Sequence, residues 1–141
     1  MTAETGESIM KSIIALAVLS ICCTDGLARC WTVGEFKGVS VSKSDAYKMV
    51  PDGFGKYAPA VFIVSTEGRG MVSNHDDMRC TTMSPAAVMC VAGDSDRATL
   101  EVWTVDEARG IAVFTRTRSG FGEHDGANLF VGKVLGRCTR Q

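Results

Sequence analysis

The chain has 141 residues, of which 45% are hydrophobic and 22% charged, a composition typical of one globular domain and not of a disordered segment. Its 15 Lys and Arg residues nearly balance 16 Asp and Glu residues, so the formal net charge is −1. This balance excludes the strong positive field with which many proteins bind nucleic acid or an anionic membrane.

An apolar run at residues 13–23 predicts an export signal. The run is too short for a membrane-spanning helix, which needs about 20 residues, but it fits the hydrophobic region of a signal peptide. Lys11 precedes the run, and Gly26-Leu27-Ala28 follows it with small residues at the two positions that a signal peptidase reads. We therefore expect a signal peptide over residues 1–28, cleavage after Ala28, and a single mature domain over residues 29–141, with no transmembrane span.

Two alternatives for the N-terminus stay open. Glu4 and Glu7 make the first residues acidic, which is unusual for a signal peptide, so translation could begin at Met10 instead. Residues 19–22 also have the general form of a lipoprotein signal ending at Cys22, although that signal favours a small residue where Ile21 stands. A lipid-anchored chain beginning at Cys22 is therefore the minor alternative to a periplasmic or secreted protein.

Four cysteines follow the predicted signal, and an even number in a short exported domain predicts disulfides. Of the three possible pairings we favour Cys80–Cys90, which closes a short loop, together with Cys30–Cys138, which ties the two ends of the mature chain. A metal site made of four cysteines is the alternative, but the Cys-x-x-Cys spacing typical of such sites is absent.

The mature chain reads as short β runs between turn signals, which predicts an all-β fold: a small antiparallel barrel or sandwich of seven to eight strands, held by disulfides. Residues 35–42 alternate polar and apolar, and the continuous apolar run at 60–66 predicts a central strand buried on both faces. One helical turn is expected around residues 45–49, with Ser44 as its N-cap, and polar loops at 74–84 and 119–126. The expected strands cover residues 30–33, 35–42, 60–66, 71–73, 86–92, 98–105, 111–118 and 127–135.

The two histidines each stand beside acidic residues in an expected loop. Imidazole and carboxylate groups bind zinc or copper, so His75 and His124, with Asp77 or Asp125, would hold one ion if the two loops meet. Such a site would support a metal-binding protein or a metal-dependent hydrolase, although the Gly-x-Ser-x-Gly motif of serine hydrolases is absent. The alternative is that these residues serve only as turn formers.

Three aromatic residues, Phe54, Tyr57 and Phe121, lie in glycine-rich loops, where exposed rings are useful anchors for a partner. The alternative is that they fold back and cover one end of the core. Trp31 and Trp103 fall within strands, so we expect both in the core.

The C-terminal third carries several basic residues. Arg116 and Arg118 are two positions apart, so they share one face of the expected strand with Phe114. That face could bind an anionic partner such as lipopolysaccharide, another polysaccharide or an acidic protein. The alternative is an ordinary solvated strand face.

Ser119-Gly120 lies in the loop before the last expected strand. With the export signal, the antiparallel fold and a disulfide near the chain ends, this dipeptide makes the chain resemble the small periplasmic lysozyme-inhibitor barrels. The resemblance implies a binding loop that contains Ser119. The sequence departs from that family at Glu123, where the family's motif has a tyrosine.

The sequence therefore predicts a non-enzymatic exported module, without a cofactor, that binds a protein or glycan of the cell envelope or of a host and does not bind nucleic acid. The alternative function is the zinc or copper site of the two histidine loops. The candidate binding residues are Phe54, Tyr57, Arg116, Arg118, Ser119 and Phe121.

Overall fold

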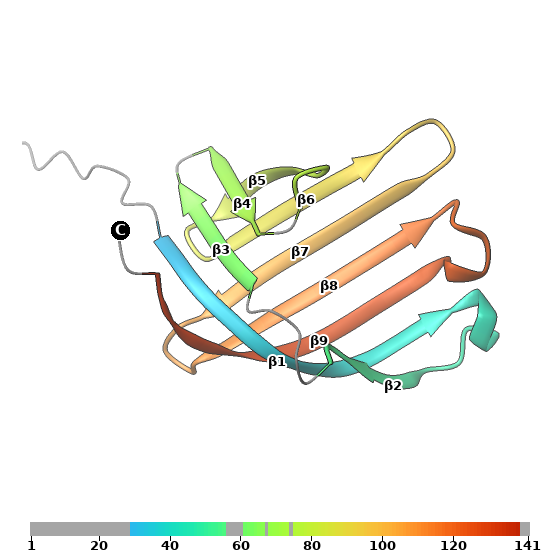
Figure 1. Cartoon of the computed structure of the whole chain (residues 1–141), viewed down its shortest axis with the longest axis horizontal. Coiled ribbons are helices and arrows are strands. Elements are labelled where there is room, and N and C mark those ends of the chain that lie inside the picture. Colours follow the sequence, from blue (N-terminus) through green and yellow to red (C-terminus); the bar gives the residue numbers. More distant parts are fainter. Residues whose placement is uncertain (1–28, 56–60, 67, 74, 139–141) are drawn as a thin grey trace, which may run out of the picture.

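In a computed structural model, residues 29–55, 61–66, 68–73 and 75–138 are described, and they form nine strands and two short 3-10 turns (Figure 1). The predicted signal peptide lies outside these residues. In the part that is described, no helix is long and apolar enough to cross a membrane. The strands are β1 (Arg29–Ser42), β2 (Val50–Gly53), β3 (Val61–Thr66), β4 (Arg69–Val72), β5 (Arg79–Ser84), β6 (Ala87–Gly93), β7 (Ala98–Asp106), β8 (Ile111–Ser119) and β9 (Gly126–Arg137), and the turns are η1 (Lys43–Asp45) and η2 (Gly122–His124).

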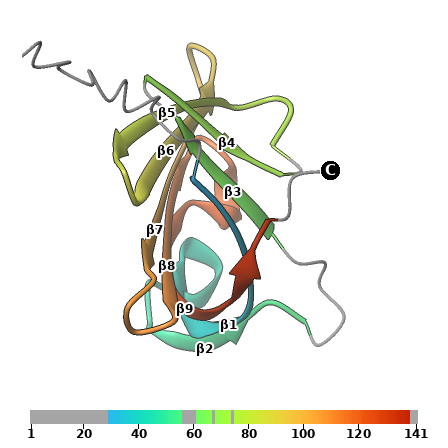
Figure 2. The ribbon, with the colours of Figure 1, turned by 90° about the vertical axis from the view of Figure 1, so that its left-hand side faces the viewer.

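All strand pairs are antiparallel, which confirms the predicted all-β class. One sheet runs in the order β4-β3-β1-β9-β8-β7-β6-β5, and β2 pairs with the second half of β1. The sheet curls, so that the β3–β4 hairpin crosses over the β6 end (Figures 1 and 2). It is not closed, because β4 and β5 share no backbone ladder in the described residues.

Side-chain hydrogen bonds join the two ends of the curled sheet. The Thr82 hydroxyl on β5 donates to the carbonyl oxygen of Thr66 at 2.8 Å, and the buried Ser65 hydroxyl on β3 donates to the carbonyl of Ser84 at 3.3 Å. Gly70 on β4 faces β6 so closely that a Cβ atom there would clash with the Val88 side chain. The close approach of β4 to β6 therefore requires glycine at this position.

The strand boundaries correct the sequence-based expectation in three places. The first two expected strands are one long strand, β1, whose pairing with β9 shifts between Gly34 and Lys37, where Glu35 has a φ of 55°. Residues 74–84 are not a polar loop throughout, because Arg79–Ser84 forms β5. Val50–Gly53 forms β2 despite its proline, since a strand at the edge of a sheet tolerates a missing N–H donor.

Two further local expectations differ from the structure. The helical turn is a 3-10 turn at Lys43–Asp45, and the positive φ angles of Ala46 and Tyr47 (52° and 57°) prevent it from continuing along the expected residues. The run at residues 60–66 forms β3 over Val61–Thr66, next to the terminal strand β4 and not at the centre of the sheet.

The core fills the concave side of the curled sheet. Phe36 of β1, Trp103 of β7 and Phe114 of β8 are buried and packed on one another, with ring centroids 5.6 Å apart for Phe36–Trp103 and 4.1 Å apart for Trp103–Phe114. Trp31 and Trp103 are each 1% exposed, as expected of core residues. The remaining buried apolar side chains are Val33, Ile63, Val72, Val88, Cys90, Val105, Ala112 and Phe130.

Both favoured disulfides are present. Cys30 and Cys138 have Cα atoms 5.2 Å apart and join the start of β1 to the residue after β9, and Cys80 and Cys90 join β5 to β6 with Cα atoms 4.0 Å apart. In the chain-entropy view the long loop contributes about 4–5 kcal/mol to the free energy of unfolding and the short one about 3 kcal/mol. Two disulfides in so small a domain indicate an oxidising setting such as the periplasm or the extracellular space.

Candidate functional site: an arginine-lined pocket

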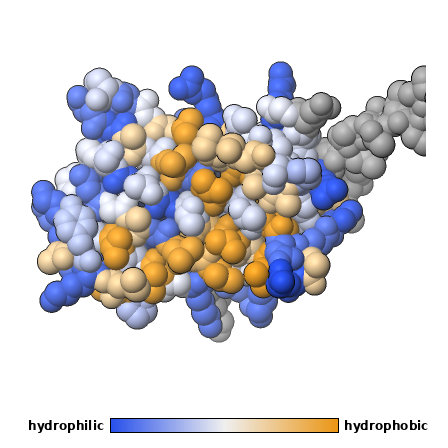
Figure 3. Space-filling view, turned by 180° about the vertical axis from the view of Figure 1, so that it is seen from behind, coloured by the Kyte–Doolittle hydropathy of each residue, from blue (hydrophilic) through white to orange (hydrophobic). Residues whose placement is uncertain are grey.

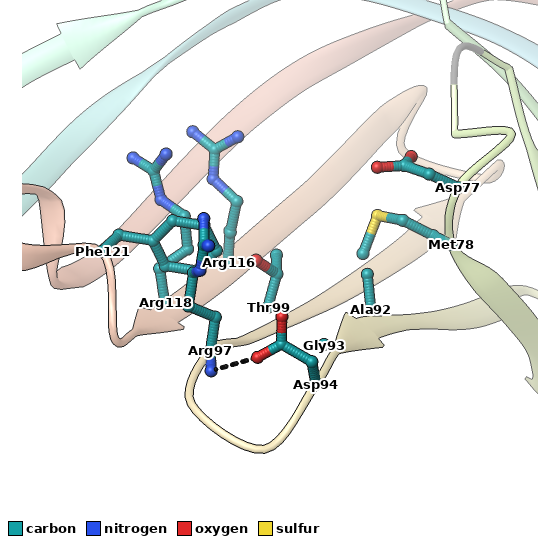
Figure 4. Close-up of a pocket in the computed structure, with 10 residues that line it drawn as sticks. All are labelled: Asp77, Met78, Ala92, Gly93, Asp94, Arg97, Thr99, Arg116, Arg118 and Phe121. Carbon is teal, nitrogen blue, oxygen red and sulfur yellow. Dashed lines mark hydrogen bonds between the residues drawn. The ribbon is translucent and has the colours of Figure 1, made fainter.

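A pocket of about 520 Å³ opens on the concave side of the sheet, at the end where β6 turns into β7 and β8 ends (Figure 4). Thr99 and Arg118 are register partners on β7 and β8, so their side chains point to the same side of the sheet. The pocket is lined by Asp77, Met78, Ala92, Gly93, Asp94, Arg97, Thr99, Arg116, Arg118 and Phe121.

The alternation of β8 explains why two arginines point into the molecule. Ala112 and Phe114 occupy the inward positions of its first half and are buried in the core. Arg116 and Arg118 continue the same inward row beyond the core. Because the apolar packing ends there, the row passes from core to pocket lining within one strand.

Three guanidinium groups line the pocket, and two of them make no hydrogen bond or close ion pair within the described residues, although the charge of Arg97 helps to lower the pKa of Asp94. The side chains of Arg97 and Arg118 make no hydrogen bond or ion pair with any residue that the structure describes. Arg116 donates from Nε to the amide oxygen of Asn128 at 3.3 Å, and its Cζ lies 5.7 Å from the centroid of the Phe114 ring. Burial lowers the pKa of Arg116, and the neighbouring positive charge of Arg118 lowers it further.

Of the two acidic residues on the pocket wall, one is already engaged by the backbone. The Asp94 carboxylate accepts hydrogen bonds from the backbone N–H groups of Asp96 and Arg97, each at 2.9 Å, and these bonds lower its pKa. It therefore shapes the β6–β7 turn that carries Arg97. Asp77 is exposed on the segment before β5. Three arginines against two aspartates leave the lining with an excess of positive charge.

A buried carboxylate stands behind the pocket. Glu101 on β7 is 3% exposed, and its Oε2 accepts hydrogen bonds from His75 Nε2 at 2.5 Å and from the Trp103 indole N–H at 3.1 Å. Its Oε1 lies 3.8 Å from Nη1 of Arg116. The hydrogen bond to Glu101 raises the pKa of His75, against the opposing effect of burial, and the Ser73 carbonyl raises it further. A protonated His75 and Arg116 thus offset the charge of Glu101.

The loop after β8 presents the aromatic wall of the pocket. The carboxylate of Asp125 accepts a hydrogen bond from the backbone N–H of Phe121 at 2.6 Å, across the 3-10 turn η2. This bond holds the loop that carries Phe121 beside the arginines (Figure 4). Asp125 is therefore a positioning residue, and Ser119 is exposed at the end of β8.

The structure brings together three of the six expected binding residues: Arg116, Arg118 and Phe121. Phe54 is instead packed into the aromatic core, with its ring centroid 4.8 Å from that of Phe36, so it covers the core as the alternative interpretation held. Tyr57 lies outside the described residues.

The sequence-based prediction of the site did not include two of its residues, Arg97 and Glu101. Arg97 stands in a turn, where nothing in the local pattern indicates which way its side chain points. Glu101 did leave a signal, because it occupies an inward position of a strand between apolar neighbours, where an acidic residue requires a partner.

The expected metal ligands are not grouped. Among the residues that the structure describes, no three His, Cys, Asp or Glu side chains are arranged to hold a metal ion. His75 is bound to Glu101, whereas His124 is exposed on η2. Asp77 belongs to the wall of the arginine pocket, and Asp125 binds the backbone of its own loop.

Comparison of the chain with protein-family models, with curated proteins and with solved structures gave no match. The resemblance to lysozyme inhibitors therefore depends on the architecture and on Ser119-Gly120 alone.

Proposed function

We propose that the protein is an exported, non-enzymatic binding module that holds an anionic group of a partner macromolecule in the pocket between Arg97, Arg116 and Arg118. The observation that carries this proposal is that three guanidinium groups line one cavity, two of them without a hydrogen bond or close ion pair among the described residues. The partner is a protein or glycan of the cell envelope or of a host.

The energetics of the pocket favour an anion. Arg116 and Arg118 repel each other, and Arg116 is partly withdrawn from water. A carboxylate, phosphate or sulfate group placed between them would remove this repulsion and form charge-assisted hydrogen bonds, which are the strong ones in proteins. Arginine presents its donors in a planar fork that matches such groups.

The pocket supports binding better than it supports catalysis. Arginine stays protonated in proteins and cannot serve as a general base. The Asp94 carboxylate is already engaged with the backbone of its turn. The pocket volume falls in the range of small-ligand sites, and the Phe121 ring adds an apolar surface for the group that bears the anion.

The test is a titration of the oxidised protein with sulfate, phosphate and acetate at constant ionic strength, followed by NMR at the arginine side-chain Nε–Hε signals. We expect saturable shifts at Arg97, Arg116 and Arg118. The R97Q/R118Q variant should lose at least about 10-fold in affinity, since a hydrogen bond to a charged group contributes about 1.5–3 kcal/mol.

Arg69→Gln on β4 is the matched control, because Arg69 is an exposed strand arginine that does not line the pocket. It should bind the three anions as the wild type does. Equal affinity of the wild type and R97Q/R118Q would contradict the proposal. If the anion affinity does depend on the arginines, arrays of acidic glycans and acidic peptides would identify the class of partner. The partner class is the one that the wild type and Arg69→Gln bind and R97Q/R118Q does not.

A further inference from the structure

A chain of polar contacts links His75, which does not line the pocket, to Arg116, which does. Nε2 of His75 lies 2.5 Å from Oε2 of Glu101, and the other carboxylate oxygen of Glu101 lies 3.8 Å from Nη1 of Arg116. Glu101 is therefore shared between a titratable imidazole and one of the guanidinium groups to which we assign anion binding.

Both ring nitrogens of His75 face hydrogen-bond acceptors. Nδ1 lies 2.9 Å from the backbone carbonyl oxygen of Ser73, and Nε2 faces the Glu101 carboxylate. A carbonyl oxygen and an ionised carboxylate can only accept, so each contact needs an N–H on the ring. Neutral imidazole has one N–H, whereas the protonated ring has two. The protonated ring therefore fits this position, and loss of its proton breaks one of the two hydrogen bonds.

We propose that protonation of His75 strengthens anion binding in the arginine pocket, so that the protein holds its anionic partner more tightly in acid than in alkaline solution. This regulation rests on the proposed function of the pocket. When His75 is charged, it balances the charge of Glu101 together with Arg116. When His75 is neutral, Arg116 balances that charge without it, and an anion in the pocket then competes with Glu101 for the same guanidinium group.

The surroundings of Glu101 make this competition strong. Glu101 is 3% exposed, and its Oε2 also accepts a hydrogen bond from the Trp103 indole N–H at 3.1 Å. Its neighbours on β7, Leu100 and Val102, point to the opposite side of the sheet. The view from behind shows a broad apolar area there (Figure 3). Charges between that apolar side and the core are screened only weakly by water and salt, so a change in one alters the energy of the others.

The other charged groups near this chain of contacts are carboxylates and one guanidinium group. Asp77 acts on His75 from the same segment, and Arg118 and Asp52 act on Arg116. Carboxylate and guanidinium groups ordinarily keep their charge between about pH 5.5 and pH 9, whereas an imidazole titrates within this range. A change in anion affinity over this range is therefore expected to follow the charge of His75.

The test is a sulfate titration of the oxidised protein at about pH 5.5 and pH 9 and at constant ionic strength. Sulfate is the probe because, unlike phosphate, it keeps its charge over this range. We expect the wild type to lose at least about 5-fold in affinity at the higher pH, which is a typical size for coupling between two sites. His75→Gln has no titratable ring and should bind sulfate with the same low affinity at both pH values. His124→Gln is the matched control, since His124 is exposed on η2, and this variant should keep the wild-type loss.

A reciprocal measurement needs no variant. If protonation of His75 strengthens sulfate binding, sulfate binding must favour the protonated ring by the same factor. Saturating sulfate should therefore raise the pKa of His75, followed by NMR of the imidazole ring, by at least about 0.7, the logarithm of a 5-fold change.

The outcomes separate this coupling from the proposed function. The coupling would be overturned, and the proposed function left intact, by arginine-dependent sulfate binding that is equal at the two pH values or by a pKa of His75 that sulfate leaves unchanged. Equal affinity of the wild type and R97Q/R118Q at both pH values would overturn both. Near-UV circular dichroism establishes whether His75→Gln is folded, and if it is not, the reciprocal measurement on the wild type decides.

Discussion

Nε2 of His75 lies 2.5 Å from Oε2 of Glu101, and this contact joins the segment before β5 to the buried face of β7. The same segment contributes Asp77 and Met78 to the pocket wall. The position of one pocket wall therefore depends on a hydrogen bond between a histidine and a carboxylate that is almost fully buried.

The contact predicts that stability falls as the pH rises through the neutral range. The pKa of His75 in the folded protein is raised above its ordinary value of 6.5, chiefly by the hydrogen bond to Glu101. A raised pKa means that the stabilisation is fully present below about pH 6.5 and is lost as the pH rises through the folded-state pKa. Urea unfolding at a series of pH values measures this loss.

His75→Gln should remove this part of the pH dependence, and His124→Gln should leave it in place. His124 is the matched control because it is exposed and carries the chain's only other imidazole. If His75→Gln unfolds with the same pH profile as the wild type, the Glu101 contact does not supply the effect.

Removing the buried carboxylate should destabilise the protein strongly. In Glu101→Ala the charges of His75 and Arg116 lose their shared counter-charge and the indole N–H of Trp103 loses its acceptor. Breaking a buried ionic cluster in this way costs about 3–5 kcal/mol of unfolding free energy. Glu101→Gln keeps an acceptor for the Trp103 indole N–H and should lose less unfolding free energy. Urea unfolding at pH 6 measures both losses. Equal losses in the two variants would argue against a role for that acceptor.

Two loop phenylalanines should behave in opposite ways. Phe54 packs on Phe36 and on Phe130, with ring centroids 4.8 Å and 5.6 Å apart, so Phe54→Ala should cost about 3 kcal/mol, the low end for buried phenylalanine. The Phe54→Ala variant should bind sulfate with the affinity of the wild type, because Phe54 does not line the pocket.

Phe121→Ala should instead weaken the binding of anions that carry an apolar group, such as benzoate, while unfolding free energy stays within about 1 kcal/mol of the wild type. Thermal unfolding and benzoate titration of both variants provide the comparison. If the Phe121→Ala variant binds benzoate with unchanged affinity, the Phe121 ring does not contribute to binding.

The close contact between β1 and β9 predicts a sharp difference between two glycines. A Cβ atom at Gly38 would clash with the backbone of Leu129 on β9, whereas at Gly136 it would meet nothing within 4 Å. Gly38→Ala should therefore lower the free energy of unfolding by at least about 2 kcal/mol, and Gly136→Ala should lower it by less than about 0.5 kcal/mol. The two variants can be compared by chemical denaturation, and similar midpoints would show that the β1–β9 approach is looser than described.

Local patterns in the sequence determined the all-β class and the four long strands β6–β9. The sequence favoured one of three cysteine pairings, and the structure confirmed it. Alternation and turn residues act over a few neighbouring positions, so hairpins such as β7–β8 can be recognised without knowledge of the rest of the chain. They also placed Arg116 and Arg118 on one strand face. Two short edge elements, β2 and β5, escaped prediction because their residues are polar or include proline, and the sheet they join supplies their pairing.

The tertiary structure alone decided which residues meet at the pocket. The curl of the sheet and the hairpin register bring Arg97, from a turn, beside Arg116 and Arg118, and they place His75 against Glu101 across 26 residues of sequence. The same curl drew Phe54 into the core, because a ring beside four other aromatic side chains is better buried than exposed. Such contacts depend on long-range packing, which the period of a single strand does not encode.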